Sequence, residues 1–156
     1  MNQLFSSFIS LGMPIYNLIS ELKHLKIEIH NVTVFQEKHN CSIIARCTIS
    51  NRSKNEITIT SIYLLLNNNE IQALEKSFCL SYIGVEVLGH QNTTEENTIA
   101  LPLRLKSYDS IETTLIFPAS KSIKIPKKSK VILKTARGNK RLVLNLTNNC
   151  KEYNMN

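Results

Sequence analysis

The sequence predicts an all-β fold, an antiparallel β-sandwich preceded by an N-terminal helix. Past Leu25, apolar residues recur at every second position, which is the period of a strand with one buried face. Several such short stretches follow one another with turn residues between them and no helical period, a pattern typical of a sandwich. The 156 residues, 42% of them hydrophobic, are enough for one domain with a core.

Three segments are expected: a helical appendage over residues 1–24, the sandwich over 25–147 and a flexible tail over 148–156. In the first segment, Gly12 and Pro14 predict a kink or two short helices. Six apolar residues recur there at steps of four and three, which places them on one stripe of a helix: Leu4, Phe8, Leu11, Ile15, Leu18 and Leu22. Packing of this stripe on the sandwich is favoured over binding of a partner or of a second copy of the chain.

The first three strands follow from apolar alternation. Residues 25–30 form the first, and residues 42–50 form the second. The third runs over 56–66, where Ile57 and Ile59 give way to Ile62 and Leu64 on the other parity. One extra residue near Thr60 or Ser61 explains this switch, so we expect a β-bulge there.

The later elements are marked mainly by turns. Weaker strands are expected within 73–87, a polar loop over 89–97, and a strand over 99–105 with Pro102 at its edge or start. A tight turn over 107–110 precedes a strand over 111–117. The final pair, 131–135 and 142–146, is a hairpin joined through 136–140, where Gly138 can supply a positive φ.

The run Ser42–Leu66, in which a strand ends in Ile49-Ser50-Asn51-Arg52-Ser53-Lys54 and resumes as Ile57-Thr58-Ile59, resembles the second and third strands of immunoglobulin-like sandwiches. It is similar in particular to the water-stress and late-embryogenesis-abundant type. With the stretches 101–117 and 133–138, the chain also resembles uncharacterised bacterial and phage-borne sandwich proteins that carry a short N-terminal helix. The resemblance covers much of residues 25–146 and implies the fold alone, since unrelated functions share it. The chain lacks tryptophan and the Cys-Trp-Cys framework of antibody domains.

Charge is unevenly distributed in this chain of net charge +7. No acidic residue lies between Glu112 and Glu152, so the domain is expected to have a basic end. One interpretation is a solvated surface that protects sheet edges, and the other is an anion or nucleic-acid site within 121–141. No aromatic residue between Phe117 and Tyr153 offers a stacking platform for bases. The candidate anion-binding residues are Lys127, Lys128, Lys130, Lys134, Arg137, Lys140 and Arg141.

The residues that could act in catalysis or metal binding form no recognisable motif. Cys41 and Cys47 on one strand would lie about 20 Å apart, too far to share a zinc ion or a disulfide. Cys47 is expected to be a small buried hydrophobe. Asp109, the only aspartate, falls in a turn where its carboxylate would accept backbone hydrogen bonds. We therefore predict no catalytic residue, no metal and no cofactor, although a site assembled from distant positions is not visible in a sequence.

These observations favour a non-catalytic protein-interaction module with an unknown protein partner. The alternatives are anion or nucleic-acid binding through 121–141 and, third, an enzyme. The N-terminal stripe also allows self-association. Residues 4–22 contain too many polar side chains for a transmembrane helix and lack a secretory layout, so a cytoplasmic location is expected.

Overall fold

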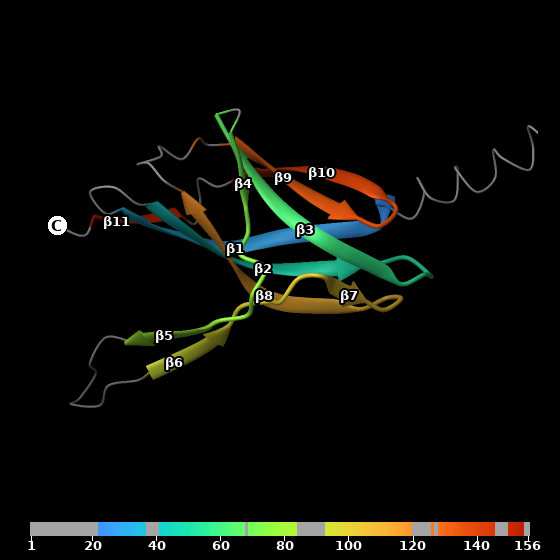
Figure 1. Cartoon of the computed structure of the whole chain (residues 1–156), viewed down its shortest axis with the longest axis horizontal. Helices are drawn as coiled ribbons and strands as arrows, with labels where there is room; N and C mark the ends of the chain where they lie inside the picture. Colours follow the sequence, from blue (N-terminus) through green and yellow to red (C-terminus); the bar gives the residue numbers. More distant parts are fainter. Residues whose placement is uncertain are drawn as a thin grey trace, which may run out of the picture.

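The computed structural model describes residues 22–36, 41–67, 69–83, 93–119, 126, 128–145 and 150–154. These residues form an all-β structure with two antiparallel sheets, consistent with a sandwich, which confirms the predicted class (Figure 1). The predicted N-terminal helix lies outside the described residues except for its end, where residues 22 and 23 are helical. Within these ranges we find no helix with the length and apolar character needed to cross a bilayer.

The first sheet has the strand order β11-β1-β2-β8. Strands β1 (Leu25–Gln36), β2 (Cys41–Asn51) and β8 (Ser110–Ala119) are antiparallel, and β11 (Cys150–Asn154) pairs with β1 in parallel. A strand thus stands at 150–154, where the sequence predicts a flexible tail. The polar side chains of this stretch show no apolar period, but pairing with the edge of β1 uses backbone groups that every residue carries.

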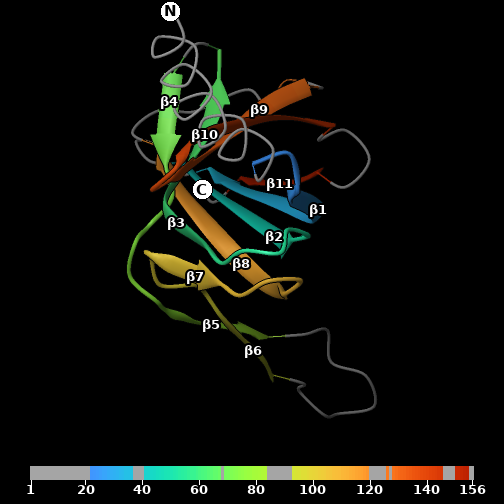
Figure 2. The same ribbon diagram turned by 90° about the vertical axis from the view of Figure 1, so that its right-hand side faces the viewer.

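The second sheet has the order β10-β9-β3-β4. Its strands are β3 (Ile57–Leu66), β4 (Asn69–Gln72), β9 (Lys128–Thr135) and β10 (Gly138–Asn145), and β7 (Leu103–Leu105) pairs with the first part of β3. Two further strands are β5 (Cys79–Ile83) and β6 (Thr93–Asn97), which among the described strands pair only with each other. This β5–β6 ribbon projects away from both sheets in two perpendicular views (Figures 1 and 2).

The core lies between the two sheets. On β2 the predicted alternation is confirmed, since Ile43, Cys47 and Ile49 are fully buried. Each fully buried aliphatic or aromatic side chain contributes roughly 1.5–3 kcal/mol, so this layer supplies most of the stabilisation. The largest fully buried side chains come from β1, β2, β3, β7, β8 and β9: Leu25, Val32, Val34, Ile43, Ile49, Ile57, Ile59, Ile62, Leu66, Leu105, Phe117 and Leu133.

Two bulges let strands keep their apolar residues inside. In β3 the pairing with β9 shifts between Ile59 and Ser61, which confirms the predicted bulge at Thr60. The Thr60 hydroxyl donates to the carbonyl oxygen of Lys134 at 3.2 Å. A second shift between Ile29 and Asn31 changes the parity of β1, so that the buried series continues through Val32.

Three further sequence predictions need correction. Residues 93–97 form β6 and not a loop, because a ribbon that stands apart from the core needs no apolar period. Residues 99–102 are not a strand, because Pro102 has no N–H for a ladder and the Leu101 N–H donates instead to Glu75 O at 2.8 Å. The hairpin turn is shorter than predicted, since Gly138 already pairs with Thr135. Its φ of 129° confirms the predicted positive φ.

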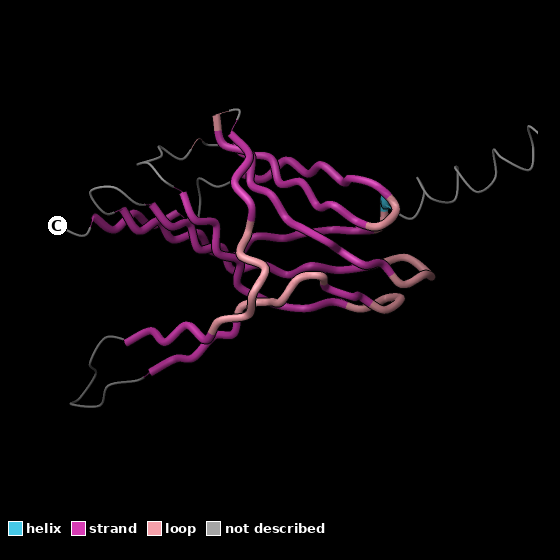
Figure 3. Tube along the Cα trace, in the orientation of Figure 1, coloured by secondary structure: helices cyan, strands magenta, loops and turns pink. Residues whose placement is uncertain are grey.

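The chain passes from one sheet to the other at Ala73 and Leu74, in the loop that follows β4 (Figure 3). The Ala73 N–H donates to Ile62 O in the second sheet at 2.8 Å, and the Leu74 N–H donates to Ile116 O in the first at 2.9 Å. Two consecutive amides therefore connect the two layers on the side of β8, and the β5–β6 ribbon begins directly beyond them.

Candidate functional site

Loops at one end of the sandwich form the first candidate site. An open hollow of about 260 Å³ lies between the end of β2, the residue after it and the turn before β8. Its lining combines two carboxylates, a guanidinium and a phenol with smaller polar groups: Glu28, Thr48, Ser50, Asn51, Arg52, Tyr108, Asp109 and Ser110. We call this surface the loop end. An open polar hollow of this kind does not exclude water from a reacting group, but it leaves side chains accessible to a partner.

Asn51 holds the loop end together. Its side chain is fully buried, and its amide nitrogen donates to the carbonyl oxygens of Asn55 and Lys106, each at 2.8 Å. Its amide oxygen accepts from the backbone N–H and the hydroxyl of Ser53, at 3.0 and 2.7 Å. One side chain thereby connects the loop after β2 with the segment that precedes the turn at 107–108, and satisfies backbone groups of both.

Tyr108 is a large exposed side chain of the loop end. It is 68% exposed, and its backbone lies in the left-handed region with a φ of 56°. Such a conformation costs a non-glycine residue about 1–2 kcal/mol, so surrounding bonds must impose it. Those bonds are present, since the Tyr108 N–H donates to Ser53 O at 3.2 Å and the Asn51 N–H donates to Asp109 O at 2.8 Å.

Sequence reasoning located part of this end. The predicted turn is confirmed, and Asp109 acts in it as expected, because its Oδ1 accepts from the Ser110 N–H at 2.9 Å. Asn51, Arg52 and Tyr108 were not among the candidate residues. A signal for Asn51 exists, since it continues the inward parity of Ile43 to Ile49, where a polar side chain must find buried partners.

A second hollow of about 220 Å³ lies beside β8. It is lined by Arg46, Asn97, Glu112, Thr113 and Thr114. The Arg46 Nε donates to Glu112 Oε1 at 3.0 Å, with both side chains about half exposed, so this pair contributes less than about 1 kcal/mol. The arrangement is that of a solvated ion pair across two strands.

The predicted anion-binding residues divide into three groups. Lys127 lies outside the described residues. Lys128, Lys130 and Lys134 alternate with buried residues of β9, and Arg141 pairs with Ile132, so these four share the outer face of the sheet. We call the outer side of the β9–β10 hairpin the basic face.

The remaining two do not join this face. Arg137 lies in the turn, where its N–H donates to the Thr135 hydroxyl at 3.1 Å. Lys140 pairs with the fully buried Leu133 and therefore lies on the inward parity of the edge strand β10, half-buried. An inward-pointing charge on an edge strand disfavours pairing with other chains, so Lys140 fits the protective interpretation of these charges.

The basic face also contains an aromatic ring that sequence reasoning missed. The Lys134 Nζ lies 4.1 Å from the centre of the Tyr63 ring, a cation–π contact. Tyr63 comes from β3, far from the basic stretch in sequence, and pairs with Ile132. Its outward parity after the bulge at Thr60 is the signal that could have located it. Val143, 65% exposed, adds an apolar side chain to the same face.

Of the predicted helical stripe, only Leu22 lies among the described residues; Leu4, Phe8, Leu11, Ile15 and Leu18 do not. Leu22 is half-buried, and its Cδ1 lies 3.4 Å from the position that a Cβ on Gly138 would occupy. The last residue of the stripe therefore lies against the turn of the β9–β10 hairpin.

Cys41, Cys47 and Cys79 are free thiols. Cys41 and Cys47 are buried, as predicted for Cys47, whereas Cys79 is exposed. Burial raises the pKa of the Cys47 thiol from 9.0 to about 12, because desolvation disfavours the thiolate. Among the residues that the structure describes, no three His, Cys, Asp or Glu side chains lie close enough to hold a metal ion.

Comparison with known proteins identifies no relative for this chain. No protein-family model matches it, and no curated protein matches it. Among solved structures, it has a similarity to an alkylpurine DNA glycosylase, AlkC, of Pseudomonas fluorescens, bound to DNA containing an abasic site analog. The identity is 10% and the TM-score 0.30; the match covers 80% of this chain and 30% of the glycosylase chain. A similarity at this level carries no conclusion about fold or function.

Proposed function

We propose that this protein is a non-catalytic protein-interaction module that presents the loop end to its partner. The observation that carries the proposal is Tyr108, an exposed aromatic side chain whose unusual backbone conformation is imposed by backbone hydrogen bonds that involve the buried residues Asn51 and Ser53. Tyrosine and arginine are the residues that most often dominate the energy of protein interfaces, and Arg52 lines the same hollow.

Rigidity supports this assignment. Ordering a loop on binding lowers affinity, so a loop that is already ordered binds more tightly for the same contacts. The bonds of Asn51 and Ser53 order the residues around Tyr108 before any partner arrives. Loops at one end of a sandwich are also where such scaffolds commonly place their binding residues.

The scaffold of this module is, in our proposal, an immunoglobulin-like sandwich of the water-stress type with an N-terminal helix. Strand order supports it. In immunoglobulin-like domains the first, second and fifth strands share one sheet, and the third, sixth and seventh share the other. Here β1-β2-β8 would correspond to the first set, and β10-β9-β3 to the second with β4 as an additional strand.

Tyr108→Asn tests the proposal, because asparagine tolerates the left-handed conformation and removes only the ring. Proteins cross-linked to the wild-type chain in its own cell extract are identified, purified and titrated against both proteins. We expect Tyr108→Asn to weaken binding at least about tenfold, the loss of one interface anchor. Val143→Ala, a change on the exposed basic face, is the matched control and should bind like the wild type. Equal affinity of Tyr108→Asn and wild type would refute the proposal.

Anion or nucleic-acid binding through the basic face is the second candidate function. It is favoured by the four cations that β9 and β10 place on one face, Lys128, Lys130, Lys134 and Arg141. Neutralised phosphates release counterions, so binding of labelled duplex and single-stranded DNA should weaken steeply between two salt concentrations. Lys130→Gln/Arg141→Gln should reduce both the affinity and the salt dependence. No binding at low salt would eliminate this candidate.

A further inference from the structure

We propose that the basic face binds single-stranded DNA, with one base stacked on the ring of Tyr63. The inference goes beyond the loop-end proposal and rests on the second candidate function, because it names the kind of nucleic acid and the way it is held. Three features carry it: cations and apolar side chains that alternate on one surface, an aromatic ring among them, and a sheet too wide for the groove of a duplex.

The register of the second sheet places cations beside apolar side chains on its outer surface. Two neighbouring rows of cross-strand partners run over β3, β9 and β10, and each row combines one cation with two apolar or aromatic side chains. Directly opposite side chains have Cβ atoms about 4.5–5.5 Å apart, so each row forms a continuous surface. The rows consist of Leu65, Lys130 and Val143, and of Tyr63, Ile132 and Arg141.

The centre of this surface is apolar. Ile132 is only 4% exposed, although its parity on β9 is outward and it does not belong to the core cluster between the two sheets. In the neighbouring row Val143 is 65% exposed. Adjacent apolar side chains with a polar rim mark a binding surface, whereas isolated ones do not. This outer face therefore offers a ligand more than charge.

Tyr63 supplies the stacking platform. Its ring is partly exposed, and the Lys134 Nζ lies 4.1 Å from its centre. Lysine has a flexible stem, so a base that stacks on the ring can displace the ammonium group toward the adjacent phosphate. The cation–π contact is then exchanged for base stacking and an ion pair, the two interactions that hold single strands on proteins without strict sequence preference.

The cations extend along β9 on both sides of the ring. Lys128 and Lys134 are six residues apart on this strand, about 20 Å at about 3.3 Å per residue. This length suits a site of about four nucleotides, the lower end of the range for single-strand-binding domains. One carboxylate belongs to the same rows of partners, since Glu70 pairs with Leu65, and it lies on β4 at the opposite edge of the sheet from β10. The phosphates therefore meet mainly positive charge.

The width of the sheet favours a single strand over a duplex. Strands lie about 4.8 Å apart, so the four strands β10-β9-β3-β4 span about 14 Å before side chains are counted. The major groove of B-DNA is about 12 Å wide, too narrow for this surface. A duplex could place its phosphates against the cations, but its paired and stacked bases could not reach Tyr63. A single strand can turn its bases toward the ring.

Apolar neighbours of the ring favour DNA over RNA. Leu65 lies two residues from Tyr63 on the same side of β3, and Ile132 is its partner on β9. Aliphatic side chains make favourable contacts with the C5 methyl group of thymine, which uracil lacks. We therefore expect a preference for thymine-containing single strands.

Titration of labelled oligonucleotides at low salt tests the inference. An oligothymidylate of about 12 nucleotides, within the range of such sites, should bind at least about tenfold more tightly than a duplex of the same length. An oligouridylate should bind about threefold more weakly than the oligothymidylate, the contribution of one methyl group. Tyr63→Leu should weaken oligothymidylate binding about tenfold and leave duplex binding unchanged, because only the single strand stacks on the ring. Tyr63→Phe retains the ring and should bind like the wild type.

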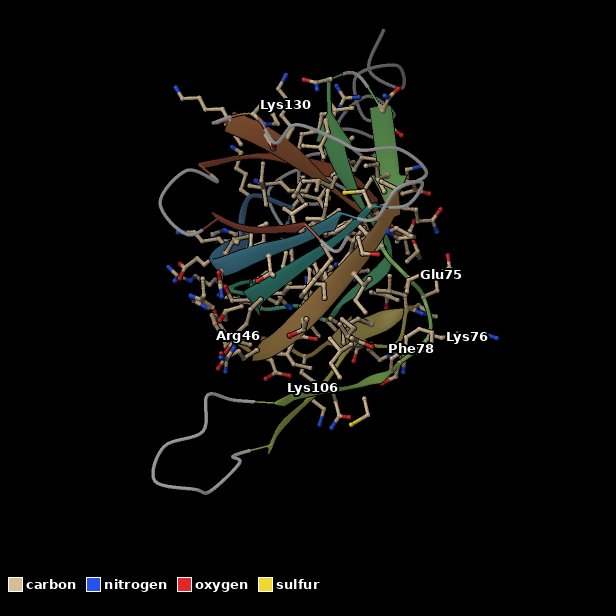
Figure 4. The ribbon with its side chains drawn as sticks, turned by 90° about the vertical axis from the view of Figure 1, so that its left-hand side faces the viewer. Arg46, Glu75, Lys76, Phe78, Lys106 and Lys130 are labelled. Atoms are coloured by element: carbon tan, nitrogen blue, oxygen red, sulfur yellow. The ribbon has the colours of Figure 1, made fainter. Side chains whose placement is uncertain are left out.

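The controls separate stacking from folding and from net charge. Bound oligothymidylate should quench the fluorescence of Tyr63, and Tyr63→Phe should bind without this part of the quenching. Urea unfolding establishes that each variant is folded. Lys130→Gln/Arg141→Gln should weaken binding of single strand and duplex alike. Lys76→Gln/Lys106→Gln removes the same charge at the other end of the molecule from Lys130 and should bind like the wild type (Figure 4).

The outcomes distinguish this inference from both proposed functions. Equal binding of single strand and duplex, or unchanged binding by Tyr63→Leu, would overturn it and leave anion binding by the basic face standing. Equal binding of oligouridylate and oligothymidylate would overturn the assignment to DNA. Absence of all binding at low salt would overturn the second candidate function as well. Tyr108→Asn should bind oligothymidylate normally, since the loop end takes no part.

Discussion

The loop end and the β5–β6 ribbon are both surface features, but they are attached to the sandwich in different ways. At the loop end, the fully buried Asn51 connects two segments through hydrogen bonds to Asn55, Ser53 and Lys106. Among the described strands, those of the ribbon pair only with each other, and the base of the ribbon is fixed by Ser77 and Phe78, which bond to Thr98 at 2.7 and 2.6 Å. We infer that the loop end is held in one geometry, whereas the ribbon can open independently of the two sheets.

Of the substitutions considered, removal of the Asn51 side chain should lower the free energy of unfolding most. Asn51→Ala leaves the Ser53 N–H and the carbonyl oxygen of Lys106 without their side-chain partner, while the Ser53 hydroxyl can still donate to Asn55 O. Each lost partner costs about 1–3 kcal/mol, partly offset by relaxation. We expect a loss of about 3 kcal/mol in the free energy of unfolding, measured in urea. Asn69→Ala, at an exposed position of β4, should change it by less than about 0.5 kcal/mol. Equal effects of the two substitutions would show that the network does not stabilise the loop end.

The buried Cys47 thiol in the core should make the free energy of unfolding fall at high pH. The folded pKa of Cys47 is about 12 against 9.0 for the free thiol, so the unfolded chain ionises first as pH rises. Its stabilising effect is complete below pH 9.0 and is lost toward pH 12, about 1.4 kcal/mol by one pH unit above 9.0. Urea unfolding of wild type and Cys47→Val at several pH values should show this extra slope in the wild type alone. Parallel profiles would contradict the burial of the thiol.

The ribbon should contribute less to folding than the loop end does. Replacing residues 79–97 with two glycines joins Phe78 to Thr98, which are already bonded to each other, since the Thr98 N–H donates to Phe78 O at 2.8 Å. The two sheets remain, so we expect the free energy of unfolding to fall by less than about 1 kcal/mol. A loss as large as that of Asn51→Ala would mean that the ribbon belongs to the folded core.

The smallest expected effect comes from Tyr108. Glycine accepts a positive φ without steric cost, so Tyr108→Gly should relieve strain of about 1–2 kcal/mol. It also gives the unfolded chain more freedom, which offsets about 0.4–1 kcal/mol. We therefore expect a gain of about 0.5 kcal/mol in urea unfolding, with partner binding lost. Destabilisation by this substitution would show that the ring packs against the fold rather than facing a partner.

Much of the fold could be predicted from sequence because most of its strands bury one face and expose the other. Strict alternation located β2 with Cys47 inside, and a change of parity located the bulge at Thr60. Gly138 marked the hairpin. Strands β6 and β11 were not predictable in this way, because their polar residues pair through the backbone and leave no apolar period.

The candidate sites were harder to predict than the strands. The basic stretch was visible, but strand parity divides its residues, placing Lys140 inward and Arg141 outward. The contact of Tyr63 with Lys134 depends on the pairing of β3 with β9, which one sequence does not specify. The loop end depends on Asn51 meeting carbonyl oxygens from a segment more than fifty positions away in the chain. Such long-range pairings appear only once the topology is known.

Hydrogen exchange of individual amides tests the central comparison most directly. The Ser53 N–H, bonded to the buried Asn51 oxygen, and the Tyr108 N–H, bonded to Ser53 O, should exchange only through opening of most of the fold. The amides of Leu80 and Ser81 in β5 should exchange through local opening at a much lower free energy. Equal protection of the two regions would contradict the distinction between a fixed loop end and a separately opening ribbon.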